Sequence, residues 1–305
     1  MNQFDRLFAE SGLSLERLRS FLAVAEAGNI AKAAGGDPTR QSQFSRQVKD
    51  LESYFGTPLT RRVGRRIEVT AEGLALARVI RRHFSDLDDF RESMSGRSVA
   101  VRIGSAASVL EWMVLPRLAD CRGALGDVIL ELEQSRTAEV VRGVADGRLD
   151  FGIVHEGALP VGTKRWKLGR IGYGLFAPKG AWKMGGGIEA VMAKHSFAEL
   201  LPGGTFHRHF QAYLAEKGWN PHVVARVSSF LTLARMVRCE GLAAVLPLTA
   251  IVEFDAASVK VEQLSWQQER ALVLVANARS IERAGLHKGA AKELAKVLAW
   301  EGAAP

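Results

Sequence analysis

Side chains able to pair with nucleic-acid bases gather in one short stretch near the amino terminus. Arg40, Gln41 and Gln43 follow Asp37-Pro38-Thr39, which is a turn and helix-start signal. An arginine can donate two hydrogen bonds to the O6 and N7 atoms of guanine, and a glutamine can pair similarly with the N6 and N7 atoms of adenine. The first turns of a helix lying in the major groove make most such contacts. We therefore predict base contacts from these three side chains.

The helix that would carry them is expected to run to about Phe55. Its apolar residues recur at three- and four-residue steps and predict a buried stripe, formed by Phe44, Val48, Leu51 and Phe55. The other polar candidates for DNA contact on this helix are Ser45, Arg46 and Gln47. Either Asp37 or Thr39 could cap the helix. The same polar face would also suit the solvated side of an ordinary three-helix bundle, so the helix alone does not decide its function.

Two short helices are expected to precede it. The first is an amphipathic helix with apolar residues from Leu15 to Ala25, which Ser14 is placed to cap and Gly28-Asn29 ends. The second covers residues 30–34 and stops at Gly35-Gly36. Two short helices, a glycine-containing turn and a third helix with a polar outer face are typical of a helix-turn-helix.

An arginine-rich hairpin is expected next, because Gly56-Thr57-Pro58 breaks the third helix and a basic strand, a glycine turn and a second basic strand follow. Its four arginines fall within six positions: Arg61, Arg62, Arg65 and Arg66. Arginines beside a recognition helix suit phosphate and minor-groove contacts. The hairpin therefore predicts a wing and favours the DNA-binding interpretation of the third helix.

A long fourth helix should begin after Thr70, which carries a capping signal. Its apolar stripe comprises Leu76, Ile80, Phe84 and Leu87. Because the preceding domain is small, the stripe suggests a partner helix from a second subunit. Packing of the stripe against its own chain is the alternative.

The run over residues 15–73 resembles the DNA-binding domain of LysR-type transcriptional regulators. The segments that carry the resemblance are Leu18 to Glu26, Phe44 to Val48 with Leu51-Glu52, Phe55 to Leu59, and Gly64-Arg65-Arg66 leading to Val69 to Gly73. The resemblance implies a winged helix-turn-helix over residues 14–71, a dimerising linker helix and hinge over residues 72–94, and an effector-binding domain over residues 98–303.

Three features depart from the family pattern. Residues 40–43 replace the usual Ser-Gln-Pro-Ala type of recognition-helix start, which leaves the DNA sequence preference open. Thr60 stands where a phenylalanine is common. Gly35-Gly36 would weaken the end of the second helix by about 1 kcal/mol per glycine relative to alanine.

The remaining two hundred or so residues alternate strands with helices, which favours parallel sheets with covering helices. We expect two α/β lobes of the periplasmic-binding-protein type, and the resemblance implies lobe I over residues 98–164 and 268–303 and lobe II over residues 165–267. Residues 172–177 are expected to form a strand, and residues 284–300 a final helix. The resemblance extends here more weakly, through Leu149 to Ile153 and Gly241 to Pro247.

Ligands of open α/β sheets bind beyond the carboxyl ends of the strands, where helix amino-termini present N–H groups to anions. The segments at such places are Ser105 to Ser108, Val154-His155, Gly203-Gly204-Thr205 and Ser228-Ser229-Phe230. Within them the resemblance favours Ser105, Ser108, Thr205 and Phe230 as effector contacts, and His155 is a further candidate. Serine and glycine at strand-to-helix turns are also needed for capping, so these positions have a purely structural interpretation as well.

Net charge, cysteine content and the lack of long apolar segments limit the classes of function that the sequence allows. The net charge is +8, of which residues 1–95 contribute only +2, from 15 Lys and Arg against 13 Asp and Glu, so net charge gives DNA binding little support. The two cysteines form no CxxC pair, and we see neither a secretory signal nor a membrane span; a cytoplasmic protein without a metal site is expected. Residues 172–177 fit a GxGxxA pattern but lie in an expected strand, so no cofactor is predicted.

The resemblance thus implies a regulator that binds double-stranded DNA as a homodimer through residues 72–92, or as a homotetramer, with RNA polymerase as a further candidate partner. A small-molecule effector, an anion for example, would bind between the lobes. Two alternatives remain open. The carboxy-terminal domain could be only an oligomerisation platform, or it could be an α/β enzyme with an appended DNA-binding head, although no catalytic motif supports the enzyme.

Overall fold

The computed structural model describes residues 5–9, 11–63, 66–94, 99–183, 185–266, 270–283 and 285–300. The chain divides into two compact units. The first comprises residues 1–97 with Asp146–Arg148, and the second comprises residues 98–145 and 149–305. Each unit is described by itself.

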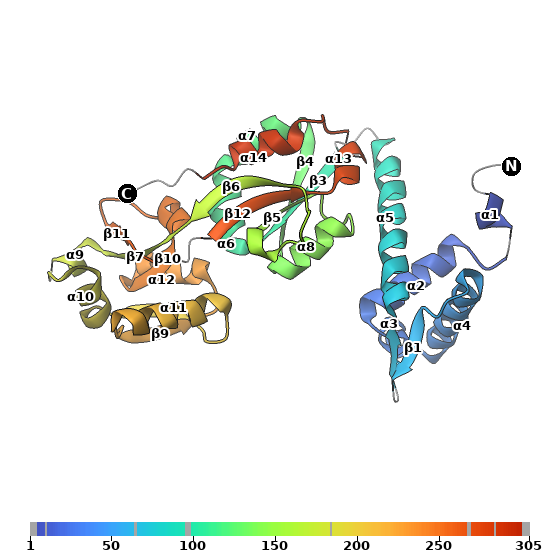
Figure 1. The fold of residues 1–305 in the computed structure, drawn as a ribbon, viewed down its shortest axis with the longest axis horizontal. Helices are drawn as coiled ribbons and strands as arrows, with labels where there is room; N and C mark the ends of the chain where they lie inside the picture. The colour runs from blue at the N-terminus through green and yellow to red at the C-terminus, as the bar shows by residue number, and fades with distance from the viewer. Residues whose placement is uncertain are drawn as a thin grey trace. The chain divides into compact units, whose positions relative to one another are not determined.

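The first unit is a set of helices with one hairpin (Figure 1). Its elements are α1 (Asp5–Phe8), α2 (Leu15–Ala27), α3 (Ile30–Ala33), α4 (Pro38–Phe55), β1 (Thr60–Val63), β2 (Arg66–Val69) and α5 (Ala71–Ser93). β1 and β2 pair antiparallel. The predicted helix-turn-helix, wing and long fourth helix are thereby confirmed as secondary structure.

The helix ends of this unit follow from capping. The Ser14 hydroxyl accepts a hydrogen bond from Arg17 N, and the Thr70 hydroxyl accepts one from Gly73 N, as the sequence predicts. Gly35 and Gly36 have φ of 63° and 85°. These glycines therefore form the turn after α3, where other residues would be strained, and do not weaken the helix itself.

The core of this unit takes in part of α5. Phe21, Phe44 and Leu51 pack in one cluster with Ala77 and Ile80 of α5. Leu76 and Phe84 pack against the same cluster, so our preference for a partner helix over the whole apolar stripe is wrong for three of its four residues, and only Leu87 remains exposed. Gly73 allows the close approach, because a Cβ there would collide with the carbonyl oxygen of Leu59.

The second unit contains two five-stranded sheets, one for each lobe. The first lobe contains β3 (Val99–Ser105), β4 (Val128–Gln134), β5 (Phe151–His155), β6 (Arg165–Ile171) and β12 (Arg270–Ala276), in the order β4-β3-β5-β12-β6. Its helical segments are α6 (Ala107–Val109), the π-helical turn η1 (Leu110–Val114), η2 (Leu115–Arg117), α7 (Leu118–Leu125), α8 (Thr137–Ala145), η3 (Glu156–Ala158), α13 (Ala278–Arg283) and α14 (Ala290–Val297). α7 and α14 cover one face of the sheet and α8 the other (Figure 1).

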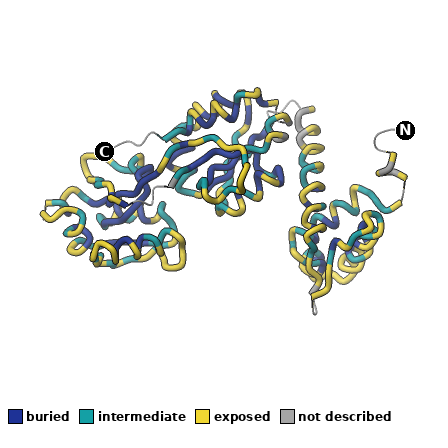
Figure 2. Tube along the Cα trace, viewed as in Figure 1, coloured by how far each residue is buried: buried dark blue, intermediate teal, exposed yellow. Residues whose placement is uncertain are grey.

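The second lobe has the sheet order β11-β7-β10-β8-β9. Its strands are β7 (Tyr173–Pro178), β8 (Phe197–Leu200), β9 (Val223–Val227), β10 (Ala243–Pro247) and β11 (Val259–Gln263). Its helical segments are α9 (Lys179–Trp182), α10 (Gly187–Lys194), α11 (Thr205–Lys217), α12 (Phe230–Glu240) and η4 (Leu248–Glu253). The inner strands of both sheets are largely buried, whereas the edge strands β4, β6, β9 and β11 are mostly exposed or half-buried (Figure 2).

Three expectations for this unit need correction. β6 pairs antiparallel with β12, so residues 165–171 belong to the first lobe. The chain therefore first passes from the first lobe to the second at Gly172, between β6 and β7. The sheets are mixed, because β12 is antiparallel to both neighbours and β7 is antiparallel to β10 and β11. Residues 284–300 do not form one helix, because Gly285 has a φ of 63° and Leu286 N bonds back to Ile281 O, which closes the turn after α13.

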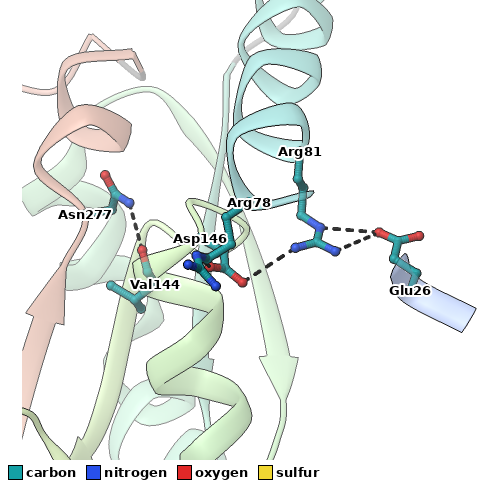
Figure 3. Close-up of polar contacts among 6 residues, drawn as sticks. All are labelled: Glu26, Arg78, Arg81, Val144, Asp146 and Asn277. Carbon is teal, nitrogen blue, oxygen red and sulfur yellow. Dashed lines mark hydrogen bonds and ion pairs between the residues drawn. The ribbon is translucent and has the colours of Figure 1, made fainter. Parts of the chain in front are cut away.

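Two hydrogen bonds between side chains and the backbone connect separate segments of the first lobe. The side-chain amide of Asn277 donates to the carbonyl oxygen of Val144 at 2.7 Å, which ties the end of β12 to the end of α8 (Figure 3). Asp150 is almost fully buried and accepts from Arg102 N at 2.7 Å. The aspartate of the Leu149 to Ile153 motif thus has a structural role.

Candidate functional sites

The amino-terminal turn of α4 presents most of the predicted base-reading side chains. Asp37 caps the helix by accepting from Thr39 N at 2.8 Å and Arg40 N at 3.3 Å, which decides between the two capping candidates. Arg40, Gln41 and Gln43 are exposed. The Arg40 guanidinium lies 5.9 Å from the ring centre of Phe44, an arrangement that orients it at the start of the helix.

Gln47 of the same helix does not belong to this exposed surface. Its side chain is only 8% exposed, and its amide donates to Glu16 Oε1 at 3.3 Å, toward α2. The Gln43 amide lies 3.5 Å from the same oxygen but remains exposed. The structure therefore turns Gln47 into the domain and leaves Gln43 at its surface.

The exposed face of α4 includes residues that the sequence analysis missed. Arg46 is exposed as predicted and Ser45 is half-buried. The polar side chains at three- and four-residue steps from Arg46 are also exposed: Thr39, Ser42, Lys49 and Ser53. The signal was present in the sequence, because these positions lie opposite the Phe44, Val48 and Leu51 stripe on a helical projection.

The structure describes the side chains of two of the four wing arginines. Arg61 and Arg62 on β1 are exposed, and Arg61 lies 3.6 Å from Glu68 across the hairpin. Arg65 lies outside the described residues, and Arg66 pairs with Val63 in the hairpin, with its side chain outside the description. The wing and the first turns of α4 thus offer guanidinium and amide donors from neighbouring segments of one small domain.

Glu52 joins these two parts. Its Oε1 atom accepts hydrogen bonds from Leu59 N at 2.9 Å, Thr60 N at 2.8 Å and the Thr60 hydroxyl at 2.9 Å. Thr60, an unusual residue for the resemblance, is thereby explained as a hydrogen-bond donor. One carboxylate fixes the start of the wing against the end of α4.

The predicted effector residues lie at the carboxyl ends of strands or just beyond them. Ser105 is fully buried and donates to Ile153 O at 2.8 Å, so its hydroxyl is already used within the sheet. Ser108 in α6 and His155 at the end of β5 are half-buried. β3 and β5 are neighbours, which brings the first-lobe candidates together.

The second-lobe candidates begin two helices. Thr205 is exposed at the start of α11, and Arg208 reaches its hydroxyl at 3.5 Å. Phe230 begins α12, where Ser229 supplies the cap by accepting from Thr232 N at 3.1 Å. The capping interpretation is therefore correct for Ser229.

Phe230 belongs to an aromatic cluster at this edge of the lobe. Its ring lies 4.9 Å from that of Phe206 and 6.3 Å from that of Tyr173, and Trp266 lies 5.1 Å from Tyr173. α6 of the first lobe contacts α12 of the second. The helices that carry Ser108 and Phe230 therefore meet at the junction of the two lobes.

Two family comparisons match this architecture. Residues 15–74 match the family described as "Bacterial regulatory helix-turn-helix protein, lysR family". Residues 95–288, more than half of the chain, match the "LysR substrate binding domain". The chain belongs to the LysR family.

Curated proteins and solved structures resemble this chain at low sequence identity. The chain is 29% identical over 150 residues to the probable hydrogen peroxide-inducible genes activator of Mycobacterium leprae (strain TN), covering 48% of this chain and 47% of that protein. The chain thus spans about half the length of the curated relatives it matches. ArgP from Mycobacterium tuberculosis gives a TM-score of 0.61 at 18% identity, covering 92% of this chain and 96% of that one.

Full-length CbnR, solved in complex with its target DNA, gives a TM-score of 0.55 at 17% identity, covering 92% of this chain and all of that one. These structural similarities establish that the LysR-family chain shares the fold of full-length regulators. In the described part of the chain, no helix combines the length and apolarity that crossing a membrane requires.

Proposed function

We propose that this LysR-family protein is a sequence-specific DNA-binding transcription regulator. The single observation that carries the proposal is the capped start of α4, where Arg40, Gln41 and Gln43 are exposed. These are the turns that a recognition helix would insert into the major groove. The wing arginines Arg61 and Arg62 would hold phosphates on either side of the groove. Arg65 and Arg66 are proposed to add to this grip.

Dimerisation through residues 72–92 is part of the proposal. α5 is pinned to its own domain by Arg81, which donates to Glu26 Oε1 at 3.1 and 3.3 Å (Figure 3). Beyond this point, large apolar side chains of α5 are exposed, and Leu87 is 55% and Phe90 63% accessible. Leu87 also lines a groove of about 530 Å³ between α5 and Leu15 and Leu22 of α2. Exposed apolar surface of this kind favours a second copy of the helix.

The groove is lined by both apolar and charged side chains. Its lining residues are Leu15, Leu22, Arg81, Phe84, Ser85, Leu87, Asp88 and Arg91. A pair of DNA-binding domains joined here would read a site with dyad symmetry, because the protein's two-fold axis imposes its symmetry on the half-sites. A tetramer would contain two such pairs.

The second unit is proposed to bind a small-molecule effector between its lobes, at Ser108, His155, Thr205 and Phe230. Ser105 would shape this site from behind, since its hydroxyl is engaged by Ile153 O. An effector would change DNA binding only through different affinities for two arrangements of the protein. We further propose that the protein is not an enzyme, acts in the cytoplasm and meets RNA polymerase at its promoters.

The experiment that tests the DNA-binding proposal is selection of genomic fragments by the purified full-length protein. Enrichment of a short dyad-symmetric site supports it, and the neighbouring genes then suggest effectors to titrate against the protein. Recovery of fragments without enrichment of any site would mean that the protein binds DNA without sequence specificity. Saturable binding of a metabolite, weakened by Phe230→Ala, tests the effector site separately, and no binding by any metabolite of a broad panel would favour an oligomerisation platform.

A further inference from the structure

The turn that follows β3 and α6 buries its side chains in two different cores. Within the π-helical turn η1, Leu110, Met113 and Val114 pack in the core of the first lobe. Trp112 does not. Its side chain is 0% exposed and packs among second-lobe residues, including Leu233 and Val237 of α12 and Ala250 of η4.

The backbone of η1 explains how one turn serves both cores. Leu115 N bonds to Leu110 O, five residues back, which widens the turn relative to an α-helix. Pro116 follows and has no N–H to give to the carbonyl of Trp112, so an ordinary helical bond at this point is impossible. The wider turn directs Trp112 away from its neighbours and toward the second lobe.

A hydrogen-bond chain holds the indole in place. Trp112 Nε1 donates to Glu253 Oε1 at 3.2 Å, at the end of η4. Arg238 of α12 donates to Glu253 Oε2 at 3.0 Å. The only polar atom of the indole is therefore satisfied, as a buried tryptophan requires, and the carboxylate that satisfies it is itself held by a guanidinium.

These contacts stand apart from the two places where the chain crosses between lobes, which lie between β6 and β7 and between β11 and β12. Rotation of the lobes about the crossings would move η1 past α12 and η4. We propose that Trp112, Glu253 and Arg238 form an inter-lobe latch that fixes the angle between the lobes, so that the lobes open only when the indole leaves the second-lobe core.

The latch goes beyond the proposed function, because it acts whether or not an effector binds. It also lies next to the lobe junction, since α6, which carries Ser108, leads directly into η1, and Phe230 begins the helix that carries Arg238. A molecule that binds at this junction and changes the angle between the lobes must therefore also change how the Trp112 indole packs in the second-lobe core.

Distances between spin labels in the full-length protein test the latch. Lys292→Cys on α14 and Ala212→Cys on α11 place one exposed label on a helix of each lobe. Cys239→Ser removes the exposed native thiol, and Cys121 is buried and stays unlabelled. Labelled protein is diluted with unlabelled protein so that only distances within one chain are measured.

We expect a single narrow distance distribution for the parent protein. Trp112→Phe, which removes the indole N–H and one ring, should broaden the distribution or add a second maximum. Glu253→Ala, a change at a partly exposed side chain, should do the same without disturbing the core. Trp219→Phe is the matched control, because Trp219 packs on Tyr213 inside the second lobe and should leave the distribution unchanged.

Unchanged distributions in both Trp112→Phe and Glu253→Ala would overturn the latch. If Trp112→Phe fails to fold, as judged by its circular dichroism, Glu253→Ala decides the question alone. Hydrogen exchange supplies a second readout, because release of the latch should speed exchange of α12 and η4 amides relative to those of α11, and equal protection in the parent and Glu253→Ala proteins would also contradict it.

Discussion

Thr60 gives both its backbone N–H and its hydroxyl to one oxygen of Glu52, at 2.8 and 2.9 Å. Glu52 lies near the end of α4, and Thr60 begins the wing. Because Leu59 N reaches the same oxygen, a single carboxylate sets the position of the wing relative to the helix proposed to read DNA.

Thr60→Val should lower the free energy of unfolding by about 1 kcal/mol, because it removes one hydrogen bond while keeping the shape of the side chain. Urea unfolding of the full-length protein, followed at the transition of the first unit, measures the loss. Thr39→Val is the control, since the hydroxyl of Thr39 is exposed at the other end of α4. Equal midpoints for the two variants would show that the Glu52 contact does not stabilise the domain.

Gln43→Ala and Gln47→Ala should separate base reading from folding. Gln43 is exposed, so its removal should relax the preference at one base pair by about 1–3 kcal/mol if a bidentate contact is lost. Gln47 is buried against Glu16, so its removal should lower stability and keep the preference. Competition among operators with single-base changes measures both, and a full preference retained by Gln43→Ala would mean that the register of α4 on DNA differs from the proposal.

Arg62→Ala should weaken binding to all DNA sequences alike. An arginine that neutralises one phosphate contributes about one unit to the slope of log K against log salt, so the slope should fall by about 1. Arg142→Ala, an exposed arginine on α8, is the control and should leave the slope unchanged. Loss of preference at one base pair, with an unaltered slope, would instead assign Arg62 to base contact.

The two cysteines should differ in reactivity. Burial, with a smaller contribution from the Asp120 carboxylate, raises the pKa of the Cys121 thiol from 9.0 to about 11, whereas Cys239 is exposed. At pH 8 a thiol reagent should modify Cys239 alone in the native protein and both in denaturant. Since the folded pKa of Cys121 exceeds the unfolded one, its contribution to stability is complete below pH 9 and is lost as the pH rises toward 11. Two fast-reacting thiols in the native protein would contradict this account.

Local signals predicted the first unit well. Ser14, Asp37 and Thr70 lie where their side chains can accept from a helix amino-terminus, and such caps depend only on neighbouring residues. The burial of Gln47 could not be predicted in the same way, because its side chain bonds to Glu16, which is 31 residues away in the sequence. The helical projection did contain the information that Lys49 and Ser42 face outward.

Long-range pairing explains the errors in the second unit. The sequence of residues 165–171 contains no signal that this strand pairs with residues 270–276, so the strand is assigned to the second lobe from the sequence alone. The break between α13 and α14 depends on a positive φ at Gly285, which the helical pattern of the flanking residues conceals. Trp112 is the extreme case, since its partner Glu253 is 141 residues away.

The affinity ratio between a selected operator and a scrambled duplex of equal length tests the central claim most directly. It should be measured by titration of the full-length protein at two salt concentrations. We predict an operator bound about 10³-fold or more tightly than the scrambled duplex, with the preference persisting as salt rises. A ratio near one at both salt concentrations, with affinity that only falls as salt rises, would contradict sequence-specific regulation by this protein.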